Sequence, residues 1–407
     1  MADGLKLNLK EAILLKNAEG TWWEIKGKDN SGANFSWQSP VVFSVDLSLD
    51  ALNRISLFIR SDSGGTHRID WGEGEATTST TTSTFAGYTR IYEASTGVFD
   101  VKITSSVPFS VSCPSETVAI KGYYGNNYNK LSSSSAPNLV SVPEYLPPNI
   151  TDIGFCLTSA TLFNDPAVAT WDTSKVVNME SVFQGASAFN QDISGWDTSN
   201  VADMESLFRD AHAFNQNISG WNTSSVTNMK GLFWDASAFN QNISGWDTSS
   251  VTDMAFMFSE TDAFNQNISG WDTSSVTAMA FMFDRAVAFN QNISGWNTSS
   301  VTNMLSMFSG ASAFNQNLGS WDISSATTLS GMFNNSGLST ENYSRTLIGW
   351  ANSHFAGSAQ DNVFLGATAV TYNNTTYTTG NEFNDAVSAR NYLVNTAGWT
   401  ITDGGQV

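Results

Sequence analysis

Carboxylates are the side chains of this 407-residue chain whose number and spacing come nearest to acid–base chemistry. Cleavage of a glycosidic bond needs two carboxyl groups in unlike surroundings, one of them protonated at the start. Here a position that follows a recurring Trp accepts Asp or Asn, which keeps a hydrogen-bond acceptor and suits a turn or a cap. We therefore expect no enzymatic activity, with a polysaccharide-degrading enzyme as the remote alternative. The position is occupied by Asp172, Asp197, Asn222, Asp247, Asp272, Asn297 and Asp322.

The other reactive residue types form no recognisable site. The three histidines are not accompanied by a motif for a Ser or Cys nucleophile, and the chain has no phosphate loop, dinucleotide fingerprint or metalloprotease motif. Two cysteines, Cys113 and Cys156, are too few for a disulfide scaffold, and the sequence leaves open whether they are bridged or are buried thiols. We expect no cofactor and no bound metal.

Binding is the chemistry that the variable positions of the repeat favour. Trp234, Phe256 and Phe281 add apolar surface that the repeated pattern does not require. If they share a solvent-facing stripe, they suit a glycan or a protein ligand. The alternative is that they cover the chain's own surface or pack against another subunit, and the sequence favours neither. The candidate ligand or receptor surface consists of Arg209, His212, Trp234, Phe256, Phe281 and Arg285.

The charge of the chain narrows the class of partner. The formal net charge is −19, and residues 162–334 hold 16 acidic residues against 4 Lys or Arg. Nucleic acid and anionic lipid both need clustered positive charge, so we expect neither. A ligand of this surface is expected to be neutral or cationic. No stretch approaches the length of an apolar membrane span, and membrane insertion is not expected.

A period of 25 residues organises the part of the chain that must position these side chains. Trp, Met and Phe recur in register, and a fixed period of this length is typical of a solenoid. A single coil cannot bury its apolar side alone, so stacked coils share one core. These rows are predicted to be structural ladders, represented by Trp196, Trp221, Trp246, Trp271, Met204, Met229, Met254, Phe208, Phe233 and Phe258.

Each coil is expected to hold one short strand and one short helix. The segment AFNQNIS reads as the strand, with Phe and Ile on one face. In SSVTDM, Ser250 and Asp253 fit a capping box, and Val251, Met254 and Phe258 share one face of a helix. Repeated amides in the strand segment, such as Asn240 and Gln241, are expected to satisfy one another at the corners of the coils.

The repeat resembles that of a known family. The words FNQNISGWDTSSVT, followed by Met, Met-Phe and Ala, are similar to the 25-residue repeats of BspA-like leucine-rich-repeat surface proteins, which are abundant in mycoplasmas. The tail LSTENYSRTLIGW is similar to the usual end of such arrays. The resemblance implies a right-handed, leucine-rich-repeat-like α/β solenoid and a role in surface attachment, and it implies no catalytic residues.

The chain before the solenoid has a different character. Strand-like segments with the words IDWGEG are similar to the polycystic-kidney-disease-type immunoglobulin-like module, a β-sandwich. Before it, Trp22, Trp23 and Trp37 are candidates for docking onto another protein, or for packing within their own domain. The expected domains are an attachment segment at 1–40, the immunoglobulin-like module at 41–110, an N-terminal solenoid cap at 111–161, seven coils at 162–337 and a C-terminal cap at 338–407.

An attachment segment at one end and a recognition surface at the other is the layout of an adhesion protein. The first residues lack the basic head and apolar run of a usual secretory signal, which favours a phage virion protein such as a tail fibre, a receptor-binding protein or a capsid-decorating fibre. The alternative is an extracellular adhesin of the bacterial cell surface. Expected partners are other virion or surface proteins at the N-terminal region and a host glycan or protein. A homo-oligomer stays open.

Overall fold

The computed structural model describes the backbone of ten strands between Lys26 and Tyr123, and residues 137–357, 360–377 and 380–407 in full. All pairs among the ten strands are antiparallel. A two-stranded sheet joins β1 (Lys26–Lys28) and β2 (Asn34–Ser36). A five-stranded sheet has the order β10 (Thr117–Tyr123), β3 (Val41–Asp46), β8 (Val98–Ser105), β5 (Gly65–Asp70), β6 (Ala76–Thr81). A three-stranded sheet has the order β7 (Phe85–Ile91), β4 (Arg54–Ser61), β9 (Phe109–Ser112).

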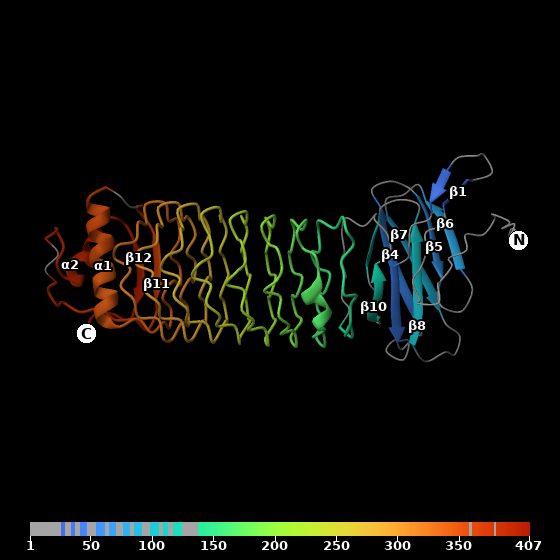
Figure 1. Cartoon of the computed structure of the whole chain (residues 1–407). Helices are drawn as coiled ribbons and strands as arrows, with labels where there is room; N and C mark the ends of the chain where they lie inside the picture. The colour runs from blue at the N-terminus through green and yellow to red at the C-terminus, as the bar shows by residue number, and fades with distance from the viewer. Residues whose placement is uncertain are drawn as a thin grey trace, which may run out of the picture.

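The following part of the chain winds into a stack of coils that ends at two helices (Figure 1). Consecutive coils are joined by single parallel β-bridges 25 or 26 residues apart, which begin at Asp152 and Asn178 and end at Asn303 and Thr328. Two further bridges lie in the C-terminal region, from Leu329 to Leu365 and from Tyr372 to Gln406. The 25-residue period therefore corresponds to one turn of a continuous repeat array.

The prediction of a short helix and a short strand in each coil is wrong. Residues 176–335 contain no helix and no strand beyond single bridges, and a 3₁₀ helix, η2 (Pro166–Thr170), lies just before them. In the segment predicted as a helix, the N–H groups of Phe256 and Phe258 donate to the next coil, at 2.9 Å each, instead of to their own turn. The intervening N–H of Met257 closes a tight turn on Met254 at 3.2 Å. A ladder of turns thus satisfies the backbone where a helix was expected.

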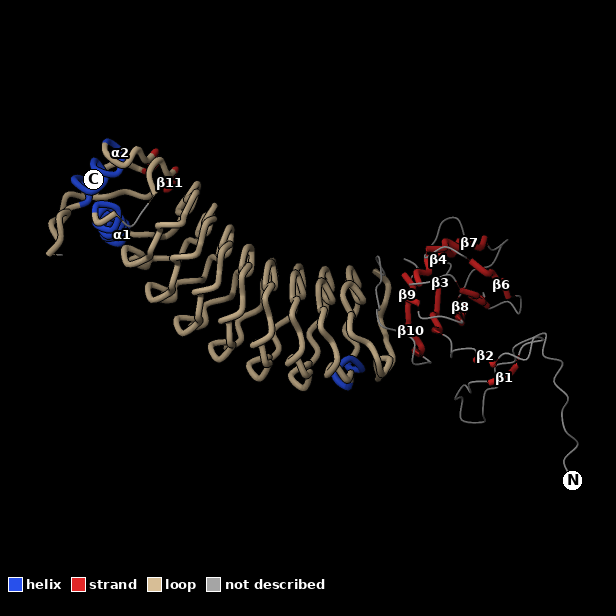
Figure 2. Tube along the Cα trace, turned by 90° about the horizontal axis from the view of Figure 1, so that it is seen from above, coloured by secondary structure: helices blue, strands red, loops and turns tan. Residues whose placement is uncertain are grey.

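The array is curved, and the bridged edge of the coils lies on the inside of the curve. Rings of Phe256 and Phe281, near the bridges, are 4.7 Å apart, whereas Trp271 and Trp296 on the other side are 6.4 Å apart. Figure 2 shows the coils closer together on the side of β11 (Phe364–Ala367) than on the side of η2. We call the bridged side the concave face.

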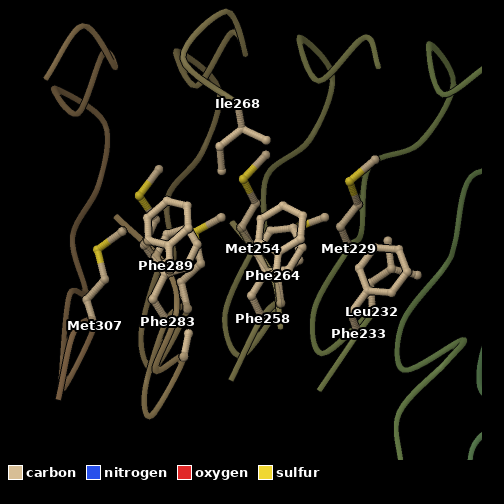
Figure 3. Close-up of a cluster of buried hydrophobic side chains, with 14 of the residues drawn as sticks. Met229, Leu232, Phe233, Met254, Phe258, Phe264, Ile268, Phe283, Phe289 and Met307 are labelled. Carbon is tan, nitrogen blue, oxygen red and sulfur yellow. The ribbon is translucent and has the colours of Figure 1, made fainter. Parts of the chain in front are cut away.

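The predicted ladders form the core. Phe258 is fully buried and stacks on Phe264 of its own coil at 4.0 Å and on Phe283 of the next at 5.6 Å. Methionines from neighbouring coils lie over these rings (Figure 3). The indole N–H of each ladder Trp donates to a carbonyl of the preceding coil, as Trp246 does to Ile218 at 3.2 Å. The Trp row thus binds coil to coil by both apolar packing and a buried hydrogen bond.

Polar side chains form a second set of ladders at the corners. Asn240 Oδ1 accepts the backbone N–H of Asn265 at 3.0 Å and the side-chain amide of Gln266 at 2.9 Å, and this pattern recurs along the array. After the Trp, Asp247 Oδ1 accepts both the N–H and the hydroxyl of Ser249. Asn222 makes the same pair of bonds. The interchange of Asp and Asn is therefore explained by a conserved acceptor role within a turn.

The C-terminal region covers the last coil. It consists of α1 (Thr340–Phe355), β11, α2 (Ala386–Asn395) and β12 (Thr400–Asp403), and β11 pairs in parallel with β12. Arg390 of α2 donates to Asp403 of β12 at 2.8 Å, and the hydroxyl of Tyr343 on α1 donates to the same carboxylate at 3.1 Å. Burial raises the pKa of Tyr343 well above its usual value. Among the described helices, none has the length and apolar character to cross a bilayer.

Candidate functional site

Two positions of every coil on the concave face have a left-handed backbone. The first left-handed position has φ between 52° and 66° and holds Phe155, Ser181, Ser206, Gly231, Phe256, Phe281, Ser306 and Gly331. The second left-handed position follows four residues later, with φ between 53° and 72°, and holds Ser159, Gly185, Asp210, Asp235, Glu260, Arg285, Gly310 and Asn335. An L-residue with a side chain costs roughly 1–2 kcal/mol in this conformation, and Gly or Asn costs less.

Large side chains at these positions lie in the middle of the array, except for Phe155 of the first bridged coil. The outer coils use residues that tolerate the backbone, such as Gly185, Gly310 and Asn335 at the second left-handed position. In the central coils, Phe256 and Phe281 occupy the first position, with φ of 60° and 57°. Since the same turns form elsewhere with Ser or Gly, the fold does not require these aromatic rings.

The bulky residues of the central coils stack in one row. The ring of Trp234 lies 4.7 Å from that of Phe256, with 19° between their planes, and Phe256 lies 4.7 Å from Phe281, with 11° between their planes. The guanidinium of Arg209 covers the other face of Trp234 at 3.8 Å. We call Trp234, Phe256 and Phe281 the aromatic row. All three side chains are half-buried.

Trp234 joins this row from a different position of its coil. The first left-handed position of that coil is Gly231, and a Cβ there would lie 3.7 Å from the Trp234 ring and 3.2 Å from the hydroxyl of Ser206. The missing side chain of Gly231 leaves the room in which the indole of Trp234 extends the line of the two Phe rings. The row is therefore built from two neighbouring columns of the repeat.

Ion pairs border the row on both sides in chain order. Before it, Lys230 pairs with Glu205 at 2.8 Å, and this hydrogen bond raises the pKa of Lys230. After it, Arg285 pairs with Glu260 at 3.1 Å. A further contact of 3.1 Å joins His212 Nε2 to a carboxylate oxygen of Asp235, next to Trp234.

Carboxylates outnumber cations around the row. Three cations, Arg209, Lys230 and Arg285, lie in the coils from 203 to 287, each within 4 Å of a carboxylate. Burial raises the pKa of Asp253 and Asp284, because the charged form loses contact with water. The same coils hold ten carboxylates. Two of them, Asp247 and Asp272, follow the ladder Trp residues, and the other eight belong to Asp203, Glu205, Asp210, Asp235, Asp253, Glu260, Asp262 and Asp284.

The candidate surface predicted from sequence divides into a stack and its border. Four of its residues stack in one line, namely Arg209, Trp234, Phe256 and Phe281. The other two lie at the border, where His212 contacts the carboxylate of Asp235 and Arg285 that of Glu260. Those carboxylates were absent from the sequence prediction. The sequence did contain a signal for these carboxylates, because the second left-handed position changes from Ser, Gly or Asn in outer coils to charged residues in central coils. The predicted attachment residues, Trp22, Trp23 and Trp37, lie outside the described residues.

The recurring carboxylates lie apart from the row and behave as turn acceptors. Hydrogen bonds from the hydroxyl and N–H of Ser174 lower the pKa of Asp172, and those from Ser274 do so for Asp272. Within the fully described parts of the chain, no cluster of three or more His, Cys, Asp or Glu could hold a metal ion. Cys156 is buried. The sequence left open whether it is bridged to Cys113, and Cys113 lies outside the described residues.

Comparison with known proteins places the repeat array in a family. Searches of curated proteins and of solved structures found no match. Two overlapping stretches, 134–246 and 235–346, match a family model described as Mycoplasma protein of unknown function, DUF285. Together they cover more than half of the chain and begin before the first bridged coil. The chain therefore belongs to the DUF285 family of repeat proteins.

Proposed function

We propose that this chain is a non-enzymatic adhesion protein that binds its target with the concave face of the repeat array. The observation that carries the proposal is the stacked pair Phe256 and Phe281, which occupy left-handed positions where five other coils have Ser or Gly and the first bridged coil has Phe155. Backbone strain that the fold does not need is typical of functional surfaces. The central place of the row and its half-exposed rings support a contact surface.

The rest of the chain fits attachment. We propose that the array is leucine-rich-repeat-like and right-handed, as in BspA-like surface proteins, and that residues 41–110 form an immunoglobulin-like module. The antiparallel sheets of five and three strands support the second proposal, although β9 and β10 continue them past residue 110 to Tyr123. In this arrangement the N-terminal region joins the carrier, and the array presents its concave face to a host glycan or protein.

We propose a virion as the carrier, with the protein acting as a tail fibre, receptor-binding protein or capsid-decorating fibre. A cell-surface adhesin is the second candidate, and the description of the family as a mycoplasma protein favours it. Mass spectrometry of density-purified virus particles and of cell envelopes from the source culture separates the two. Stoichiometric peptides in particles support the virion, and recovery only from envelopes overturns it.

Attachment by the concave face is tested with the labelled full chain on intact cells of the source culture. The variant Phe256→Ser/Phe281→Ser gives both coils a residue that Ser206 and Ser306 show to be compatible with the turn. The control Val287→Ser also removes an exposed apolar side chain, 42% exposed, outside the row. We expect attachment to fall in the double variant alone. Equal attachment of all three proteins would refute the proposal.

A further inference from the structure

We infer that the partner of the concave face is a polypeptide segment in which apolar side chains alternate with Lys or Arg, and not a glycan. The inference rests on the proposed function and names the class of partner for that surface. It depends on how the rings of the aromatic row are oriented and on the charges beside them.

The faces of the stacked rings are occupied by the protein itself. Phe256 has Trp234 against one face and Phe281 against the other, both at 4.7 Å. The second face of Trp234 is covered by the guanidinium of Arg209 at 3.8 Å. Sugars bind aromatic residues by laying their C–H groups on a free ring face, and here that leaves at most the outer face of Phe281. The row is therefore poorly suited to a carbohydrate chain.

Apart from the outer face of Phe281, only the edges of the three rings are left for contact with a partner. Aromatic edges carry a partial positive charge and pack well against aliphatic side chains or the faces of other aromatic rings. The steps of 3.8, 4.7 and 4.7 Å from Arg209 to Phe281 make a row about 13 Å long, the length of about four residues of extended chain. A short extended segment with apolar side chains on one side matches this ridge.

The border of the row sets the charge of that segment. Without Asp247 and Asp272, which follow the ladder Trp residues, eight carboxylates and three cations lie in the surrounding coils, and the cations already have carboxylate neighbours in the same chain. The excess of negative charge favours Lys or Arg at the partner's remaining positions. It disfavours a second copy of this face, because two surfaces of the same sign repel each other.

The experiment uses the full chain and four defined probes in fluorescence anisotropy. Three are labelled peptides of about eight residues, twice the length that the row accommodates: alternating Leu and Lys, alternating Leu and Glu, and alternating Ser and Lys. The fourth is a labelled neutral glucan oligosaccharide. Each is titrated with wild type, Phe256→Ser/Phe281→Ser, the charge variant Asp235→Asn/Glu260→Gln, and the control Val287→Ser. Thermal melts confirm that every variant is folded.

We expect the Leu–Lys peptide to bind wild type and Val287→Ser alike, and roughly tenfold more weakly to the double Ser variant, since buried aromatic contacts dominate interfaces. Its affinity should also fall in the charge variant and at high salt. Equal binding of the Leu–Glu peptide, row-dependent binding of the glucan, or no Leu–Lys binding would overturn the inference. If cell attachment still needs the row in any of these cases, the proposed function stands without it.

Discussion

Two phenylalanines two residues apart test whether the aromatic row belongs to the fold. Phe281 is half-buried at the first left-handed position, whereas Phe283 is fully buried and stacks on Phe289 at 3.9 Å. Phe281→Gly introduces the residue that two other coils carry at this position, and Phe283→Ala removes a ring from the core. We expect the first change to be nearly neutral and the second to be strongly destabilising.

The structure gives the expected magnitudes. Phe281 has one stacking partner, Phe256, worth about 1 kcal/mol, and burial of half the ring contributes about 1 kcal/mol more. Removing the side chain also relieves a left-handed backbone penalty of about 1.5 kcal/mol. The net loss is about 0.5 kcal/mol. Truncating the buried ring of Phe283 costs about 4 kcal/mol, because it loses its transfer free energy and leaves a cavity.

Thermal unfolding of the full chain, followed by circular dichroism, measures the difference. At about 2–4 °C per kcal/mol for an array of this size, Phe281→Gly should lower Tm by about 1–2 °C and Phe283→Ala by about 8–16 °C. The mutants are compared with wild type in the same buffer and at the same scan rate. If Phe281→Gly lowers Tm as much as Phe283→Ala, the ring is a structural element, and the argument from strain to function fails.

Three further predictions concern the ladders and use the same melts. Asn240→Ala should cost about 1–2 kcal/mol, because the backbone N–H of Asn265 loses its acceptor; an unchanged Tm would show that water replaces the ladder. Trp246→Phe should cost about 2–3 kcal/mol, since the carbonyl of Ile218 keeps the N–H of Trp221 but loses the indole donor, and the smaller ring leaves a cavity; a loss below that of a surface mutation would contradict this. Burial raises the pKa of Asp253, so the folded state favours its neutral form, and the penalty is present at neutral pH and disappears as pH falls below the ordinary value of 3.8. Asp253→Asn should therefore raise Tm at pH 7 and have no effect near pH 3, and a gain that persists at low pH would show another cause.

The period of the sequence was sufficient to predict the array and its core. A ladder requires the same side chain at the same place in each coil, and the rows of Trp, Met and Phe met that condition in the letters alone. The exchange of Asp and Asn after the Trp likewise pointed to an acceptor, and Asp247 and Asn222 make the same bonds to the serine two residues on. Repetition of one residue type therefore reported its environment.

The sequence pattern did not predict the backbone conformation within a coil. Met254 and Phe258 point into the core four residues apart, which a helix and a ladder of turns both allow. Asp253, which fitted a capping box, accepts the N–H of Ala255 two residues on, as in an Asx turn. A helix and a ladder of turns differ in φ at Phe256 and Glu260, where the observed backbone is left-handed. A Phe or Glu in the sequence does not indicate a left-handed backbone. Only the Gly and Asn that other coils carry at these positions gave that signal.

The ladders also explain how central coils can tolerate residues that fit the backbone poorly. In a repeat array, stability is approximately a sum over coils and their neighbours, so a local penalty is offset by the packing of the same coil. Phe283 and Trp296 belong to the same coil as Phe281. Both are almost fully buried and stack on their counterparts in the two adjacent coils. Identical cores therefore leave the concave face free to diverge from coil to coil. The aromatic row lies among the residues of this face that differ from coil to coil.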